Sequence, residues 1–161
     1  INNSDKKEIT LYDEIETCKL YLQLESMRFD EKFTYEVNVA ENIDLKSVQV
    51  PALIIQPFIE NAIWHGIIPK NNKGHISLRV EKNNNEVEII VEDDGIGRKL
   101  SMQNIAPANP THTSKGIALT ASRLKLDNLL KHRKGGLSIT DKETTAGSSE
   151  GTKVVLSFSE E

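Results

Sequence analysis

Alternation of apolar and polar residues is the feature that most constrains the fold of this chain. Residues 75–81 (HISLRVE) and 86–93 (EVEIIVED) both alternate, and three asparagines at 83–85 join them. Strands with one buried face show this period of two, and a short polar join between two such strands predicts a hairpin. The other alternating segments are 33–39 (FTYEVNV), 136–140 (GLSIT) and 152–159 (TKVVLSFS), the last two predicting a second hairpin around 147–151.

Helical spacing of apolar residues predicts three helices. A capping box at Thr10 opens the first, which runs to about Phe29. The second is expected to open at Pro51, because proline is favoured in the first turn of a helix, and to kink or restart at Pro57. The third follows from Gly116. This order of elements predicts an α+β fold, a two-layer α/β sandwich in which helices cover one face of a mixed, mostly antiparallel sheet.

The first helix carries two apolar stripes, which is more apolar surface than one small core needs. The residues of the first stripe are Leu11, Ile15, Cys18 and Leu22, and those of the second are Leu20, Leu24 and Met27. A single stripe is enough to dock a helix on a domain. The sequence therefore leaves open whether the second stripe packs on the domain or meets a partner.

Composition and missing motifs exclude several classes of protein. A chain of 161 residues suits one domain, and a net charge of -4 gives no electrostatic case for nucleic acid or for contact with an anionic membrane. The single cysteine, Cys18, excludes an internal disulfide, and the opening INNSDKKE is no signal peptide. No P-loop, GxSxG or zinc spacing is present. We expect a cytoplasmic-type domain cut from something longer.

The stretch 56–67 (QPFIENAIWHGI) is typical of a buried helix, yet it contains Glu60, Asn61 and His65. A buried amide or carboxylate without a partner costs roughly 1–3 kcal/mol, which raises the question of what these groups face. The amide oxygen of Asn61 is a hard ligand suited to Mg²⁺, an ion that binds few protein groups and completes its shell with phosphate and water. Taken alone, Asn61 is equally well explained as an amide on a helix surface.

Features that suit a nucleotide follow the strand at 86–93. Asp93 lies at the C-terminal end of this strand and can accept a hydrogen bond from an exocyclic amine such as that of adenine. Gly95 and Gly97 lack a Cβ, so the backbone can turn sharply and approach a flat base. Gly116, at the start of a helix, presents free N–H groups to phosphate. DDGIG alone is more often an ordinary turn, so the order and spacing of these elements favour nucleotide binding.

Four stretches together resemble the GHKL superfamily of ATP-binding domains (the Bergerat fold), and within it the catalytic domain of LytS-type sensor histidine kinases. VPALIIQPFIENAIWHG is similar to the N box of that family, VEDDGIGR and SKGIALTASRL to its two glycine boxes, and GTKVVLSF to its final glycine–threonine strand. Upstream, YLQLESMRFDEKFTYEV is similar to the lead-in of the ATP-binding domain. The resemblance covers nearly the whole chain.

The resemblance implies roles for individual residues. Asn61 would be the Mg²⁺ ligand and Asp93 the adenine acceptor, while residues 98–115 would form a mobile lid over ATP. Glu60 stays open between a structural carboxylate and a catalytic one. The other residues implied to bind the cofactor are His65, Gly95, Gly97, Lys115, Gly116 and Thr152.

The resemblance also implies the function and the partners. Residues 31–161 would be the ATP-binding domain, and residues 1–30 the end of a dimerisation and phosphoacceptor helical hairpin. The γ-phosphate of ATP would pass to a histidine on that upstream domain of a homodimer, and then to a response regulator, for which a LytTR-type protein is one candidate. The parent protein would be a two-component sensor in the cell membrane, with this domain on the cytoplasmic side and no membrane contact of its own.

Three positions depart from the family pattern. Trp64 stands where many histidine kinases have a lysine, so a phosphate contact is either missing or supplied by Lys115 or Arg123. Ala118 replaces a common glycine. Pro57 stands where ATP-hydrolysing members carry a water-activating glutamate, which favours transfer to a partner because proline cannot act as a base. Two alternatives to a histidine kinase domain stay open. One is another GHKL ATPase or serine kinase module, and the other is a non-catalytic nucleotide-binding signalling domain.

Overall fold

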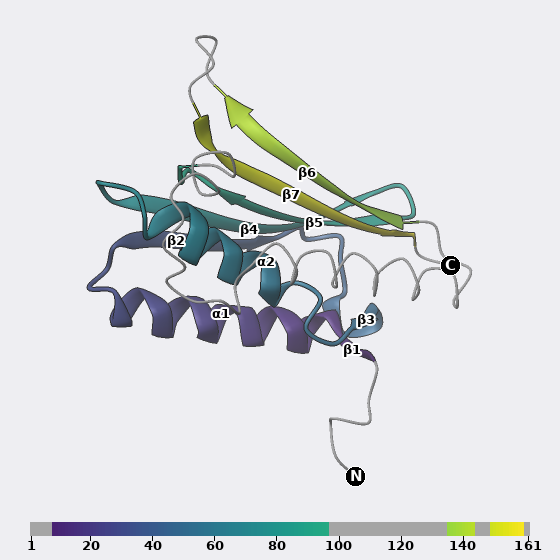
Figure 1. Cartoon of the computed structure of the whole chain (residues 1–161). Coiled ribbons are helices and arrows are strands. Elements are labelled where there is room, and N and C mark those ends of the chain that lie inside the picture. The colour runs from purple at the N-terminus through teal and green to yellow at the C-terminus, as the bar shows by residue number, and fades with distance from the viewer. Residues whose placement is uncertain (1–7, 97–134, 144–148, 160–161) are drawn as a thin grey trace.

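A computed structural model describes residues 8–96, 135–143 and 149–159 of the chain (Figure 1). Its main feature is a five-stranded sheet in which β2 and β4 are parallel and all other neighbours are antiparallel. This confirms the predicted mixed, mostly antiparallel sheet. In spatial order the strands are β2 (Phe33–Val39), β4 (Gly74–Asn83), β5 (Glu86–Asp93), β7 (Ser149–Ser159) and β6 (Gly135–Glu143).

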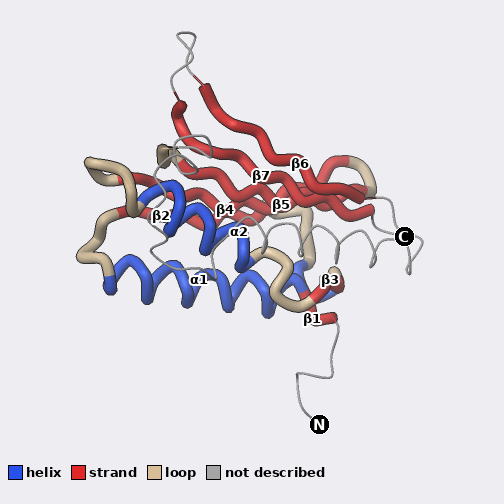
Figure 2. The backbone as a smooth tube through the Cα atoms, in the orientation of Figure 1, coloured by secondary structure: helices blue, strands red, loops and turns tan. Residues whose placement is uncertain are grey.

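Two helices lie on the same side of this sheet and make the second layer (Figure 2). Helix α1 spans Leu11–Arg28, and its predicted cap is present, because the Thr10 hydroxyl accepts a hydrogen bond from the backbone N–H of Asp13 at 3.1 Å. Helix α2 (Gln56–Asn61) continues without a break into a π-helical segment, η3 (Ala62–Ile67). The predicted two-layer architecture is therefore confirmed.

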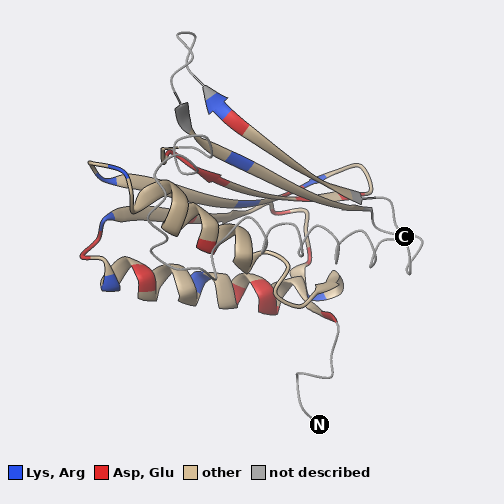
Figure 3. Cartoon of the chain, in the orientation of Figure 1, with Lys and Arg blue, Asp and Glu red and all other residues tan. Residues whose placement is uncertain are grey.

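The core lies between the helices and the covered face of the sheet. Alternate residues of β4, β5 and β7 point towards the helices, as the sequence alternation predicts, and the residues between them are polar or partly exposed except Ile90, which is also buried. Figure 3 shows both signs of charge on the described strands. The buried apolar residues of these strands that belong to the core cluster are Ile76, Leu78, Val80, Val87, Ile89, Val91, Val154, Leu156 and Phe158.

The two apolar stripes of α1 have different environments. The first stripe is buried in the core, with Leu11, Cys18 and Leu22 each fully inaccessible. The second stripe faces away from the domain, with 55% of Leu20, 53% of Leu24 and 68% of Met27 exposed. Of the two interpretations that the sequence left open, packing of the second stripe on the described part of the domain is wrong.

The prediction that the second helix opens at Pro51 is also wrong. Pro51 ends a short strand, β3 (Gln49–Pro51), which pairs antiparallel with β1 (Glu8–Thr10). Proline fits an edge strand as well as a helix start, because its fixed φ is compatible with both and its missing N–H matters in neither. The helix begins instead at Gln56, with Pro57 in its first turn.

Two further features refine the expectations. The hairpin between β4 and β5 turns through residues 84 and 85, and Asn84 has a φ of 57°, a conformation that asparagine tolerates better than most residues. A short 3₁₀ helix, η2 (Leu45–Ser47), lies between β2 and β3. The loop expected at 98–115 and the helix expected from Gly116 lie outside the described residues.

Candidate functional site

Asp93 is a buried carboxylate at the end of β5, on the face of the sheet that the helices cover. It is 5% exposed, and the side chains that precede it on that face are Ile89 and Val91. Its Oδ1 accepts a hydrogen bond from the Gly95 N–H at 2.8 Å, and its neighbour across the β5–β7 ladder is Thr152. Burial raises the pKa of the Asp93 carboxyl from 3.8 to about 6, against the opposing effect of the Gly95 N–H.

Three glycines allow the backbone to pack closely around Asp93. A Cβ on Gly66 would lie 2.8 Å from Asp93 Oδ1, and a Cβ on Gly95 would overlap the backbone of Gly66. Gly151 has a φ of +114°, and a Cβ there would overlap the Asp93 carbonyl. No other residue type fits these positions without movement of the backbone or the carboxylate. The three glycines thus form a cradle around Asp93, which is called the glycine cradle below.

The helix above Asp93 changes its winding where the predicted metal ligand lies. Asn61 is the last residue of α2, and Ala62 begins the π-helical segment, which closes with the Ile68 N–H donating to the Ile63 carbonyl at 2.9 Å. Such segments are rare and are frequently found at functional sites. At its end, the Gly66 carbonyl accepts the Ile96 N–H at 3.0 Å, so this helix is tied to the turn that follows Asp93.

Glu60 and Trp64 contact other parts of the protein. Glu60 Oε1 accepts a hydrogen bond from Gln56 Nε2 at 3.1 Å. Burial raises the pKa of the Tyr21 hydroxyl on α1 to about 12, and the charge of Glu60 contributes to that rise, so Glu60 lies near α1. Trp64 packs edge-on against Phe29 with ring centroids 5.2 Å apart. The tryptophan therefore attaches the π-helical segment to the C-terminal end of α1.

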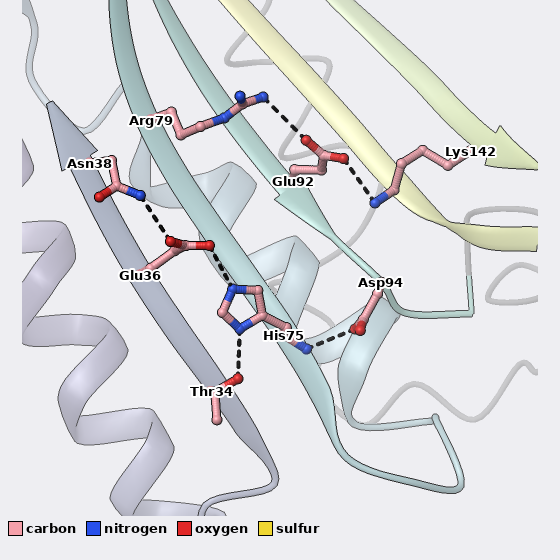
Figure 4. Close-up of polar contacts among 8 residues, drawn as sticks. All are labelled: Thr34, Glu36, Asn38, His75, Arg79, Glu92, Asp94 and Lys142. Carbon is pink, nitrogen blue, oxygen red and sulfur yellow. Dashed lines mark hydrogen bonds and ion pairs between the residues drawn. The ribbon is translucent and has the colours of Figure 1, made fainter. Parts of the chain in front are cut away.

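Asp94, the next residue after Asp93, makes a separate set of contacts (Figure 4). Its Oδ1 accepts the His75 backbone N–H at 2.7 Å and forms an ion pair with Lys70 at 3.5 Å. The His75 ring in turn contacts Thr34 and Glu36 on β2 and lowers the pKa of the Glu36 carboxyl. Asp94 therefore fixes the turn to β4, whereas Asp93 lies in the glycine cradle.

The structure brings together only part of the predicted site. Asp93, Gly95 and Thr152 meet at one end of the sheet, and His65 precedes Gly66, which lies against Asp93. Asn61 lies one turn earlier on the same helix. Gly66 and Gly151 belong to this group and were given no role from the sequence, although both lie inside the quoted motifs. Gly97, Lys115 and Gly116, with Ala118 and Arg123, lie outside the described residues.

Comparison with known proteins identifies the family. The sequence profile of the histidine kinase-, DNA gyrase B- and HSP90-like ATPases matches residues 48–161. The chain belongs to this family, as the resemblance of its motifs predicted. Within the family, its sequence relatives and its fold are those of sensor histidine kinases and their catalytic domains, and ATP is the nucleotide that such a domain binds.

The relatives are similar over most of this chain but are much longer. The sensor protein LytS of Oceanobacillus iheyensis is 29% identical over 76% of the chain and 21% of that protein. The sensor histidine kinase YpdA of Escherichia coli is 33% identical over 78% of the chain and 22% of that protein. The chain thus spans about a fifth of the length of these relatives.

Solved structures share the fold at low sequence identity. The catalytic domain of the histidine kinase ThkA superposes with a TM-score of 0.60 at 12% identity, covering 95% of this chain and 96% of that one. The mycobacterial sensor histidine kinase MprB superposes with a TM-score of 0.58 at 18% identity, covering 94% of this chain and 95% of that one.

Within the residues that the structure describes, no helix is long and apolar enough to cross a membrane.

Proposed function

We propose that this domain binds ATP with Mg²⁺ and transfers the γ-phosphate to a histidine on a helical domain elsewhere in the parent protein. The observation that carries the proposal is the buried Asp93 carboxylate in its glycine cradle. An ionised carboxylate can accept about four hydrogen bonds, and the Gly95 N–H uses one of them on Asp93. The carboxylate can therefore also accept a hydrogen bond from the exocyclic amine of a base. A Cβ on Gly66 would meet the Asp93 carboxylate, and Cβ atoms on Gly95 and Gly151 would meet the backbone beside it, so the three glycines let the chain pack closely around this acceptor. These residues fit an adenine.

Asn61 is the proposed protein ligand of the metal. It lies at the junction of α2 and η3, on the helix that ends over Asp93. Among the described residues, no three histidine, cysteine, aspartate or glutamate side chains are grouped to hold a metal ion. One amide oxygen nevertheless fits Mg²⁺, which takes its remaining ligands from phosphate and water. Bound there, Mg²⁺ would neutralise phosphate charge during transfer.

The residue at position 57 supports transfer over hydrolysis. Pro57 lies in the first turn of α2 and carries no group that could deprotonate water. Histidine as acceptor needs only alignment with the γ-phosphate, because phosphoryl transfer depends mainly on positioning and charge neutralisation. The domain would therefore bind and present ATP, and the acceptor would come from outside residues 1–161.

The exposed stripe of α1 supports an upstream helical partner. Leu20, Leu24 and Met27 repeat at helical spacing on the face of α1 opposite to its buried residues. Such a face is expected where a helix continues a bundle. We extend the proposal accordingly: residues 1–30 are the end of the dimerisation and phosphoacceptor hairpin, and this stripe meets helices of a homodimer in a parent protein held at the cell membrane.

A response regulator is the proposed final acceptor. The histidine kinase ThkA has been solved in complex with the response regulator TrrA. That structure superposes on this chain with a TM-score of 0.57 at 16% identity, covering 96% of this chain and 41% of that one. By analogy, the parent protein would pass its phosphoryl group to a response regulator, for which a LytTR-type protein is one candidate.

Calorimetric titration of the chain with ATP, with and without Mg²⁺, tests the proposal. We expect Mg²⁺ to strengthen binding in the natural sequence, and Asn61→Ala to remove that gain. Asp94→Asn is the matched control, because Asp94 adjoins Asp93 but makes its contacts to His75 and Lys70. If ATP does not bind, or if Asn61→Ala leaves the effect of Mg²⁺ unchanged, the assignment fails.

A further inference from the structure

Glu14 is a fully buried carboxylate on α1, and its hydrogen bonds are made to a distant segment. It is 0% exposed and lies between Leu11 and Ile15 in sequence, on the side of α1 that packs on the core. Its Oε1 accepts the Leu53 N–H at 3.1 Å and its Oε2 accepts the Ile55 N–H at 2.9 Å. A buried charge is costly unless it is hydrogen-bonded, so these two contacts hold its position.

Both donors lie at the start of the helix that carries Asn61. Ile55 is the N-cap residue of α2, and no local side chain caps that helix. The first N–H groups of a helix have no partner inside it, and a negative charge close to them is favoured by the helix dipole. Glu14 accepts the N–H of the N-cap residue, as the glutamate of a capping box does, but it does so from another helix.

The segment that Glu14 holds is conformationally strained. Leu53 has a φ of 59°, in the left-handed region that a leucine rarely occupies. Its N–H is one of the two that bond to Glu14. Without the carboxylate, this turn would lose the contact that compensates for its strain, and the start of α2 would be free to shift.

A shift at that point would reach the nucleotide site. Asn61 lies about 9 Å along the helix from Ile55 at 1.5 Å per residue, and Gly66 follows against Asp93. Near its other end the same helix is attached to α1 through the contact of Trp64 with Phe29. Helix α1 therefore contacts the nucleotide helix near both of its ends, and Glu14 makes the hydrogen bonds at its start.

We propose that Glu14 is a positioning residue for the nucleotide site, setting the place of Asn61 through the backbone N–H groups of Leu53 and Ile55. The inference rests on the proposed function, because that function assigns the metal to Asn61. It gives α1 a second role besides packing. A slide of α1 by one helical turn, about 5.4 Å, would take the carboxylate beyond hydrogen-bond reach and release the start of α2.

Glu14→Gln tests the inference, because it keeps the size of the side chain but turns an NH₂ group towards one of the two N–H donors. Leu22→Ala is the matched control: Leu22 is equally buried on the same helix and makes neither of these hydrogen bonds. We expect Glu14→Gln to weaken ATP binding in the presence of Mg²⁺ by about tenfold. Leu22→Ala should lower the Tm at least as much and change the affinity less than about twofold.

A second measurement separates the cap from general stability. Hydrogen exchange of the Leu53 and Ile55 amides should accelerate in Glu14→Gln and not in Leu22→Ala. Should Glu14→Gln fail to fold, Glu14→Leu keeps a buried apolar side chain there and should show the same faster exchange and weaker binding. Equal loss of affinity in Glu14→Gln and Leu22→Ala, or no loss in either Glu14 variant, would overturn the inference.

Asn61→Ala in the same series distinguishes the two proposals. If Asn61→Ala leaves the Mg²⁺ dependence of ATP binding unchanged, the proposed function has failed at its metal site. If Asn61→Ala removes that dependence and the Glu14 variants bind like the natural sequence, only the positioning role of Glu14 is wrong.

Discussion

Replacement of Asp93 by asparagine should change stability and nucleotide binding in opposite directions. The folded-state pKa of about 6 lies above the ordinary value of 3.8, so this group contributes stability that is fully present below pH 3.8 and is lost as the pH rises through 6. The difference corresponds to about 3 kcal/mol at neutral pH. Asp93→Asn removes the buried charge, retains an oxygen that can accept the Gly95 N–H, and should therefore stabilise the ATP-free domain above pH 6.

The same substitution should weaken ATP binding. On the proposed function, the ionised carboxylate would accept a charge-assisted hydrogen bond from the adenine amine. Loss of that bond should cost roughly 1.5–3 kcal/mol, or about 10- to 150-fold in affinity. In the natural sequence, affinity should also fall as the pH drops through about 6, because a protonated carboxyl is a poorer acceptor. In Asp93→Asn this part of the pH dependence should be absent.

Thermal unfolding and calorimetry at pH 5 and pH 7.5 measure both effects, with Asp94→Asn as the control. Asp94 adjoins Asp93 and has the same side chain, but its contacts are with His75 and Lys70, so Asp94→Asn should leave the affinity for ATP within about twofold. If Asp93→Asn binds ATP as tightly as the natural sequence, or destabilises the ATP-free domain at pH 7.5, the reasoning is refuted.

Three further predictions concern catalysis, the glycine cradle and α1. Incubated alone with labelled ATP and Mg²⁺, the chain should stay unlabelled and hydrolyse ATP very slowly, whereas the parent protein should label on a histidine outside residues 1–161; strong self-labelling of the chain would contradict this. Gly66→Ala places a Cβ 2.8 Å from Asp93 Oδ1 and should weaken ATP binding at least tenfold by calorimetry, and unchanged affinity would argue against the cradle. Leu24→Glu, at an exposed position of α1, should change the free energy of unfolding by no more than about 0.5 kcal/mol but reduce dimerisation of the parent protein in ultracentrifugation; an intact dimer would remove the stripe from the interface.

The sheet and α1 could be predicted from the sequence because their signals are local. A strand with one covered face alternates at every second residue, and the hydroxyl of Thr10 caps a helix that begins one residue later. Pro51 was misassigned because proline is compatible with two local structures, and its pairing with Glu8 depends on a contact across more than forty residues. No local sequence pattern distinguishes a proline in an edge strand from a proline at the start of a helix.

The candidate site was predictable in its polar residues but not in its geometry. Asn61 was singled out because it interrupts an apolar segment, and Asp93 because it ends a strand before a glycine-rich turn; their roles followed from the family resemblance. The closeness of Gly66 to Asp93, the π-helical winding after Asn61 and the bond from Glu14 to Ile55 are all tertiary. For Gly66 a weak signal existed, since a glycine inside a helical pattern is less favourable than alanine and can mark close packing.

Several features that are uncommon in a stable core lie near Asp93, at one end of the sheet. A buried carboxylate, a glycine at φ +114° and a π-helical segment all occur within the contacts of Asp93 and the helix above it. Exceptions of this kind are expected where function, rather than stability, has set the residue. The carboxylate alone costs about 3 kcal/mol at neutral pH, and a ligand present at 100 times its Kd stabilises the folded state by about 2.7 kcal/mol. Bound ATP would therefore offset most of the cost of keeping Asp93 ionised, so a nucleotide-binding domain can retain such a group in its core.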